Sequence, residues 1–139
     1  MKENYSAKEI EARWQKTWED EAVFQPEPDS REKFFLTIPY PYLNGNLHAG
    51  HTRTFTIGDA VARFQRMRGK NVLFPMAFHA TGTPIVGLSE LIANRDPLIW
   101  DVYTKLHGIP EEELSGLNTP EKIVLYFRRE AKRAMQSIG

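Results

Sequence analysis

The segment from Pro39 to His51 holds the side chains whose types and spacing could do chemistry. It reads Pro-Tyr-Pro-Tyr-Leu-Asn-Gly-Asn-Leu-His-Ala-Gly-His, so that His48 and His51 bracket Gly50 after a turn-forming stretch. Each imidazole can donate a hydrogen bond to a phosphate oxygen, and a glycine lets a flat base or another backbone approach closely. The segment therefore indicates a site for a phosphate-bearing ligand.

The same histidines allow two other interpretations. A pair at this spacing could bind a metal ion, with a third ligand from His79, His107 or a carboxylate. It could also cap a helix without binding any ligand. The context favours a nucleotide, because the segment lies between a predicted strand and a predicted helix. In α/β folds ligands bind at that place, where the free N–H groups of the helix attract anions.

Three predicted elements would position this segment. Residues 34–38 form an apolar run rich in aromatic and branched side chains, which predicts a buried strand. Apolar residues then recur at helical spacing from Ile57 to Met67, which predicts a helix to about Arg68 with Gly69 as its stop. Residues 70–76 predict a second strand. Strand, helix and strand over about forty residues predict a βαβ unit with a parallel sheet.

Helices are predicted on both sides of this unit. Ser6 and Glu9 form a capping-box pattern that opens a first helix, which carries Trp14 and Trp18 on one face and packs on the main body. A surface connection follows at residues 25–30.

Beyond the second strand, three Xaa-Pro starts predict helices, and residues 110–114 predict one acidic turn. The starts are Thr83-Pro84, Asp96-Pro97 and Thr119-Pro120. The apolar face of the last helix comprises Ile123, Val124, Phe127, Ala131, Ala134 and Ile138.

Length and composition fit one globular domain. The chain has 139 residues, of which 41% are hydrophobic and 26% charged, enough for one core. It has no cysteine, which excludes disulfides, zinc-thiolate sites and thiol catalysis. No apolar run is long enough to span a bilayer and the start lacks the apolar core of a signal peptide. We therefore expect a cytoplasmic protein without a membrane partner.

The charges balance overall but are unevenly placed. Eighteen basic and eighteen acidic side chains give a formal charge of zero, whereas residues 51–70 hold five cations against Asp59 alone. The last eighteen residues are also basic. Each run fits either a solvated helix face or a surface that faces RNA.

The motifs resemble those of a known family. His48-Ala49-Gly50-His51, preceded by Asn-Gly-Asn-Leu, resembles the signature of class I aminoacyl-tRNA synthetases. The longer stretches 39–42, 59–69, 71–76 and 78–84 are similar to the leucyl-tRNA synthetases of archaeal and eukaryotic type. Isoleucyl, valyl and bacterial leucyl enzymes usually carry an acidic residue where this chain has His79, so His79 favours the archaeal-like leucyl branch.

This resemblance implies an α/β fold that is the first half of a Rossmann-type catalytic domain, with parallel strands, flanking helices and a preceding N-terminal helix. It covers residues 1–139 as the N-terminal part of that domain. The editing domain, the second Rossmann half and the anticodon-binding domain of the family are absent from this sequence. We therefore expect the remainder of a synthetase chain as a partner, and little or no activity from the 139 residues alone.

The implied reaction is leucine–tRNA ligation. Leucine and ATP, accompanied by Mg²⁺, give leucyl-adenylate and pyrophosphate, and the leucyl group passes to tRNA(Leu); no protein-bound metal is expected. By resemblance, His48 and His51 hold the ATP phosphates and stabilise the transition state at the α-phosphorus. Gly50 leaves room for adenine and ribose.

The remaining roles also come from the resemblance. Asn44 and Gly45 belong to the ATP site. Tyr42 and Tyr40 line the leucine pocket, the Pro39 backbone lies near the substrate amino group, and His79 lies where relatives bind the leucine ammonium.

Two functions of other classes remain open from the residues alone. One is a non-catalytic fragment that binds a nucleotide or RNA. The other is a small adenylyltransferase with the same His-x-Gly-His site, which would require several more strands than the two predicted. A two-stranded unit also leaves open edges, so we expect exposed apolar surface and association of the isolated chain.

Overall fold

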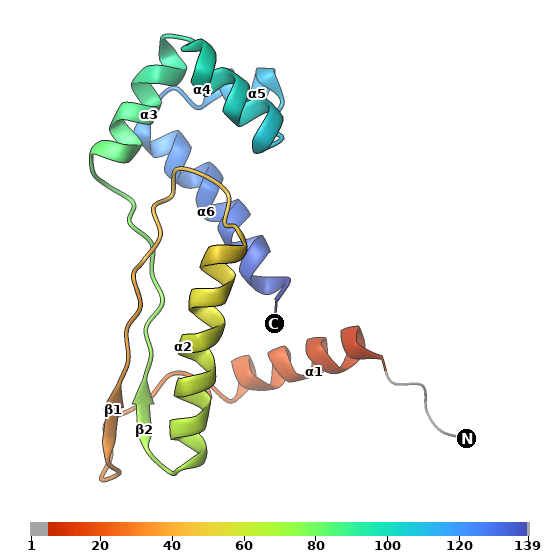
Figure 1. The fold of residues 1–139 in the computed structure, drawn as a ribbon. Helices are drawn as coiled ribbons and strands as arrows, with labels where there is room; N and C mark the ends of the chain where they lie inside the picture. The colour runs from red at the N-terminus through yellow and green to blue at the C-terminus, as the bar shows by residue number, and fades with distance from the viewer. Residues whose placement is uncertain (1–5, 139) are drawn as a thin grey trace. The chain divides into compact units, whose positions relative to one another are not determined.

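The computed structural model describes residues 6–138, which form two compact units. Unit 1 comprises residues 6–38 and 54–75, and unit 2 comprises residues 39–53 and 76–138. None of the helices within residues 6–138 is long and apolar enough to cross a membrane. The elements, labelled in Figure 1 except for the π-helix, are α1 (Ala7–Asp20), β1 (Lys33–Phe35), α2 (Ala49–Met67), β2 (Asn71–Leu73), α3 (Thr83–Ala93), α4 (Pro97–Asp101), a π-helix (Val102–Leu106), α5 (Glu111–Gly116) and α6 (Pro120–Gln136).

Unit 1 contains the predicted βαβ arrangement. β1 and β2 pair in parallel with Phe34 opposite Val72, and α2 lies between them in sequence (Figure 1). The α/β class and the parallel sheet are therefore confirmed. Each strand has three residues instead of the predicted 34–38 and 70–76. One further backbone hydrogen bond extends the ladder at each end, from the Leu36 N–H to the Leu73 carbonyl at 3.0 Å and from the Asn71 N–H to the Glu32 carbonyl at 2.9 Å.

The prediction of a buried first strand is wrong for the described residues. The Phe35 side chain is 63% exposed and Leu73 is also exposed, whereas Val72 is buried. An apolar run of this kind is typical of a strand with neighbours on both sides and both faces covered, and in residues 6–138 β1 has β2 as its one partner. The apolar composition of β1 therefore fits a strand with more neighbours than β1 has within residues 6–138.

Helix α2 begins earlier than the apolar periodicity indicated, at Ala49, and ends as predicted. Gly69 has a φ of +83°, the left-handed conformation in which glycine commonly terminates a helix. Within unit 1, Gly58 allows a close approach of the helix backbone, because a Cβ there would lie 2.6 Å from Cζ of Phe74 and 3.2 Å from a methyl carbon of Ile38. These contacts hold α2 against the segments that follow both strands.

The N-terminal helix α1 follows Ser6 as predicted, but the capping box does not form. Ser6 occupies the N-cap position without a side-chain hydrogen bond to the helix. No residue of α1 is buried, so the prediction of a packed face holds only through Trp18. The ring centre of Trp18 lies 5.5 Å from that of Phe24 and 4.4 Å from the guanidinium carbon of Arg63. Trp14 stacks on Trp18 at 6.3 Å and is 47% exposed.

Part of the basic run is engaged inside unit 1. Arg63 pairs with Asp59 at 2.7 Å, and the Arg66 guanidinium lies 4.8 Å from the Phe24 ring centre. Lys70 pairs with Glu32 at 2.6 Å. These cations have local partners, which accounts for part of the charge excess without an RNA ligand.

Unit 2 is a helical layer whose core lies between α3, the π-helix, α5 and α6. Its fully buried centre includes Ile85, Leu114, Ile123 and Phe127. The apolar face predicted for the last helix is confirmed at Ile123, Phe127 and Ala131, while Ile138 is exposed.

Two of the three predicted helix starts carry the expected side-chain cap. Asp96 accepts from the Ile99 N–H at 3.0 Å, and Thr119 accepts from the Lys122 N–H at 3.5 Å. The cap predicted at Thr83 is wrong, because Thr83 is already helical and Gly82, with a φ of +108°, is the N-cap. The predicted acidic turn becomes α5, and no sequence pattern indicated the π-helix before it.

Candidate functional site

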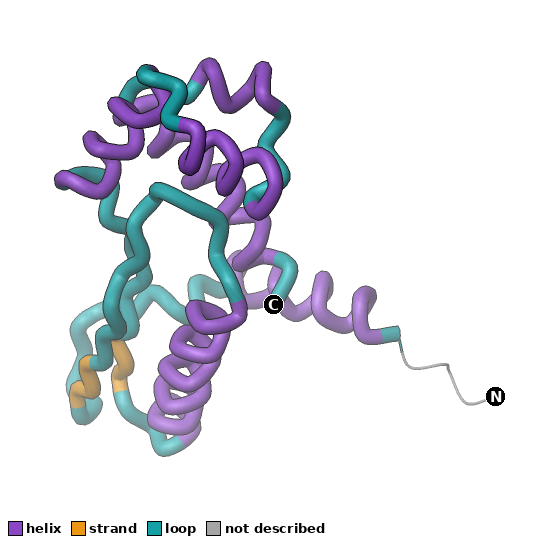
Figure 2. Tube along the Cα trace, turned by 45° about the horizontal axis from the view of Figure 1, so that its top comes forward, coloured by secondary structure: helices purple, strands orange, loops and turns teal. Residues whose placement is uncertain are grey.

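All the predicted site residues lie in unit 2, on two extended segments and the start of α2. The segments run side by side as teal loops in Figure 2, and a parallel bridge joins Tyr42 to His79. The His79 N–H donates to the Pro41 carbonyl at 2.9 Å, and the Leu43 N–H donates to the His79 carbonyl at 3.2 Å. Backbone hydrogen bonds therefore fix His79 beside Tyr42 although the two residues are far apart in sequence.

Three rings gather at this bridge. The Tyr42 and His79 ring centres lie 4.9 Å apart with 33° between their planes, and Tyr40 lies 6.2 Å from His79. Tyr42 and His79 are exposed and Tyr40 is half-buried. The bridge thus presents an aromatic surface that suits an aliphatic side chain or, through the ring faces, an ammonium group. Pro39 lies exposed where this segment begins.

His48 and His51 cap the start of α2 reciprocally. The Gly50 N–H donates to Nδ1 of His48 at 3.1 Å, and the His48 N–H donates to Nδ1 of His51 at 3.3 Å. The His48 carbonyl accepts from the N–H groups of His51 and Thr52. This is the geometry of a capping box, with imidazoles in place of the usual hydroxyl and carboxylate. The interpretation of these histidines as helix caps is therefore confirmed for their Nδ1 atoms.

The caps determine which nitrogen of each ring carries the proton. Because both Nδ1 atoms accept hydrogen bonds, the proton of each neutral ring is on Nε2, which is a donor. The ring centres lie only 4.1 Å apart. Burial, and secondarily the neighbouring His48, lowers the pKa of His51, which favours its neutral form. Two N–H donors at a helix N-terminus are the arrangement that binds an anion.

The His48 ring packs against the bare backbone of Gly50. A Cβ at Gly50 would lie 2.9 Å from Cε1 and 3.0 Å from Nδ1 of His48. In the structure, the space left by the missing side chain is therefore occupied by this imidazole.

The turn from Asn44 to Asn46 is held by residues that the sequence analysis did not assign to it. The Asn46 N–H donates to Nδ1 of His107 at 3.3 Å, and the Tyr103 hydroxyl donates to the Asn44 carbonyl. A Cβ at Gly45 would lie 3.0 Å from Cε1 of His107. From the sequence, His107 was considered only as a possible metal ligand. No local pattern links it to the turn at Asn46, 61 residues earlier in the chain.

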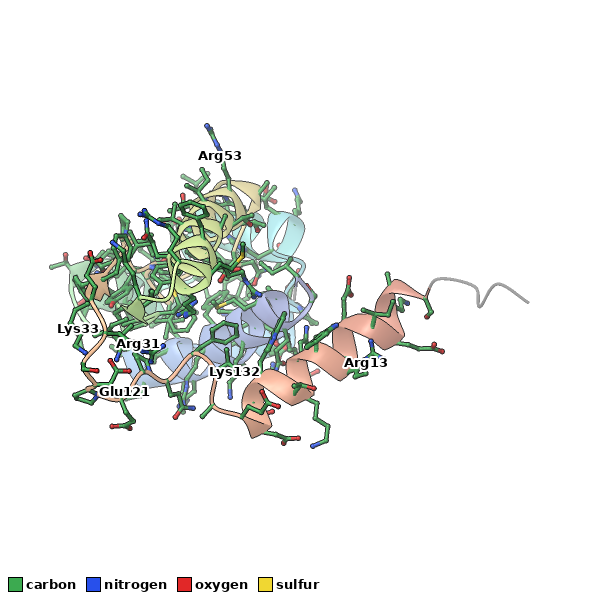
Figure 3. All side chains as sticks on the ribbon, turned by 90° about the horizontal axis from the view of Figure 1, so that it is seen from below. Arg13, Arg31, Lys33, Arg53, Glu121 and Lys132 are labelled. Carbon is green, nitrogen blue, oxygen red and sulfur yellow. The ribbon has the colours of Figure 1, made fainter. Side chains whose placement is uncertain are left out.

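Arg53 is a further functional candidate. Its sequence position indicated only that it belongs to the basic run of residues 51–70. It lies two residues after His51 and projects from the beginning of α2 in Figure 3. None of the ion pairs found within residues 6–138 involves Arg53. Its charge adds to the positive end of the helix dipole beside His51.

The structure therefore assembles the predicted residues in three groups within unit 2. His48, Gly50 and His51 form the capped helix start, and Tyr40, Tyr42 and His79 form the aromatic surface. Asn44 and Gly45 lie on the turn that precedes His48. Among residues 6–138, no group of three or more His, Cys, Asp or Glu side chains is arranged to hold a metal ion.

Comparison with known proteins points in one direction. The profile of the family described as tRNA synthetases class I (I, L, M and V) matches residues 13–93. Over all 139 residues the chain is 80% identical to the leucine–tRNA ligase of Methanothrix thermoacetophila and 68% identical to that of Methanosarcina barkeri. The chain spans 15% and 14% of the length of these two relatives.

A solved structure gives the same indication. The ternary complex of the Agrobacterium radiobacter K84 agnB2 LeuRS with tRNA and LeuAMS matches with a TM-score of 0.70 and 29% identity. The match covers 98% of this chain and 15% of that one.

Proposed function

The chain belongs to the class I tRNA synthetases, and from that premise we propose that it forms the ATP- and leucine-binding first part of a leucine–tRNA ligase. Residues 1–139 are then the opening of the catalytic domain, and the rest of the synthetase is its partner. The observation that carries the proposal is the reciprocal histidine cap, because it makes Nε2 the donor atom of both neutral rings at the start of a helix.

The proposed reaction joins leucine to AMP before transfer to tRNA. The leucine carboxylate attacks the α-phosphorus of ATP, a new P–O bond forms, and pyrophosphate leaves with the electrons of the broken P–O bond. The tRNA(Leu) ribose hydroxyl then displaces AMP. The protein contributes chiefly by positioning the reactants and by stabilising the charge that develops on the phosphate oxygens.

His48 and His51 supply that stabilisation. Their Nε2–H groups donate to the phosphate oxygens, together with helix N–H groups and the dipole of α2. The caps fix both rings before ATP binds, so that little reorganisation is needed during the reaction. Mg²⁺ enters with ATP as part of the substrate.

The aromatic surface receives leucine. The Tyr42 and Tyr40 rings contact its side chain, and His79 lies where its ammonium group is bound. A neutral imidazole accepts one hydrogen bond from the ammonium without forming an ion pair. The Pro39 backbone lies at the start of the same segment, and Asn44 and Gly45 line the ATP side.

The test is leucine-dependent exchange of pyrophosphate into ATP, measured on the intact protein that carries this sequence. We expect exchange with leucine and a loss of about a hundredfold when His51 is replaced by asparagine, which keeps an acceptor near the Nδ1 position and removes the Nε2–H donor. Val86→Ala, an exposed change on α3, is the matched control and should leave exchange unchanged. ATP binding without any exchange would contradict the proposal and favour a nucleotide-binding module.

A further inference from the structure

We propose that His107 is a positioning residue for the ATP-binding turn Asn44–Asn46, and that it sets ATP affinity without touching ATP. The inference rests on the proposed function for the role of the turn. The geometry itself is independent of that assignment, because His107 contacts the turn through both its ring and its backbone.

Three contacts join His107 to the turn. The Asn46 N–H donates to Nδ1 of His107 at 3.3 Å, and the Asn46 side-chain amide donates to the His107 carbonyl at 3.2 Å. The ring also lies against Gly45, where a Cβ would be 3.0 Å from Cε1. The side chain of Asn46 and the bare backbone of Gly45 thus both fit this one residue.

The ring of His107 is itself held firmly. It stacks on Tyr103 at 4.6 Å and 24°, and its centre lies 6.2 Å from that of the fully buried Phe127. Tyr103 adds a second support by donating its hydroxyl proton to the Asn44 carbonyl. Burial lowers the pKa of His107, which keeps Nδ1 an acceptor at neutral pH.

The π-helix provides the platform. It spans Val102–Leu106, and the His107 N–H closes its last wide turn by donating to the Val102 carbonyl at 3.2 Å. Such turns are rare and often occur at functional sites. Here the turn presents Tyr103 and His107 as stacked neighbours toward one loop.

The position of this loop matters because Asn46 is only two residues from His48. A turn that moves changes the direction in which His48 enters the helix cap, and therefore the position of the Nε2–H group that donates to ATP in the proposed function. Tyr42 and His79 are held by their own backbone bridge, so leucine binding should not depend on His107.

The experiment compares two substitutions in the intact protein. His107→Phe keeps the ring for stacking and loses the acceptor, while His107→Asn places an acceptor near the Nδ1 position. We expect His107→Phe to raise the KM for ATP about three- to tenfold, to leave the KM for leucine within about twofold, and His107→Asn to restore much of the loss. Leu106→Ala, next to it and 81% exposed, is the control and should change neither KM.

A second variant keeps the inference testable if His107→Phe fails to fold. Asn46→Ala removes one of the contacts at an exposed residue, and should raise the KM for ATP less than His107→Phe does. Because the two substitutions remove different hydrogen bonds to the same turn, the double variant should raise the KM for ATP more than His107→Phe alone. Amide hydrogen exchange of residues 44–46 should accelerate in every variant that loses a contact.

The outcomes separate the two proposals. Absence of leucine-dependent exchange in the unsubstituted protein rejects the proposed function, while faster amide exchange at 44–46 in His107→Phe still supports the positioning role. An unchanged KM for ATP with unchanged amide exchange overturns the positioning role. A parallel rise of both KM values, or a loss of active protein with normal KM values, also overturns it by showing a merely structural effect.

Discussion

Replacing Gly50 with alanine should separate the stability of α2 from the geometry of its first turn. The new Cβ would lie 2.9 Å from Cε1 of His48, whereas carbon atoms pack at about 3.5–4.0 Å. The ring must therefore move by about 0.6 Å. This movement lengthens the bond between the Gly50 N–H and Nδ1, now 3.1 Å, and shifts the Nε2–H donor.

Gly50→Ala should have a small effect on stability and a large effect on the exchange rate. Alanine favours a helix over glycine by about 1 kcal/mol, and loss of the cap costs about 0.5–1.5 kcal/mol, so stability should change by no more than about 1 kcal/mol. Displacement of a catalytic group by about an ångström costs about a hundredfold in rate. We expect leucine-dependent pyrophosphate exchange to fall about ten- to hundredfold at a nearly constant Tm.

The matched control is Gly87→Ala on α3. Apart from its chain neighbours and the nearby backbone of its own helix, no atom lies within 4 Å of the Cβ that would be added there. This variant should therefore gain about 1 kcal/mol of stability and retain full exchange activity. The reasoning is refuted if Gly50→Ala exchanges at the normal rate, or if its loss of activity is matched by an equal loss of folded protein.

Three further predictions concern the same helix start and two helix caps. His48→Asn keeps the acceptor for the Gly50 N–H and loses the Nε2–H donor, so exchange should fall about a hundredfold at unchanged Tm; a normal rate would contradict the role of that donor. The pKa of His51 is lowered by burial in the folded state, so the unfolded chain takes up a proton on this ring at a higher pH than the folded chain does. The stability that the neutral His51 ring contributes is therefore complete above about pH 6.5 and is lost as the pH falls through the lowered folded-state pKa. The fall in Tm from pH 7.5 to 5.5 should be smaller in His51→Gln, and an equal fall argues against this coupling. Asp96→Ala should lower the free energy of unfolding by about 1 kcal/mol, measured by denaturant unfolding. Ser6→Ala removes no cap bond and should change it by no more than about 0.5 kcal/mol. Equal effects of the two substitutions would show that the cap hydrogen bond is not the cause.

Features of the fold determined by a few adjacent residues were predictable from sequence. Asp96 and Thr119 cap the helices that their following prolines start, and Gly69 ends α2 with a positive φ. The parallel pairing also followed, because a strand, a helix and a strand of these lengths leave few alternatives. Ser6 and Thr83 failed because a capping pattern states which side chains are available, and the backbone decides whether they reach the N–H groups.

The site was predictable only in part. His48, Gly50 and His51 lie within four residues, so their common location followed from the sequence. Which nitrogen of each ring accepts the cap bond, and which therefore carries the proton, followed only from the structure. His107 and Tyr103 could not be linked to the turn at Asn44–Asn46 from the sequence. They reach it across 61 and 59 residues, through a π-helix whose hydrogen-bond register leaves no mark in the composition.

The reciprocal cap also bears on which ions can occupy the helix start. A histidine that binds zinc or nickel through Nε2 carries its proton on Nδ1 and normally donates it to an oxygen. Here each Nδ1 faces a backbone N–H, of Gly50 for one ring and of His48 for the other. Metal ligation by Nε2 would therefore place two N–H groups against each other at both rings and break both caps. The tautomer in which Nε2 carries the proton therefore disfavours transition metals at this pair, although the spacing of the two histidines alone would allow them.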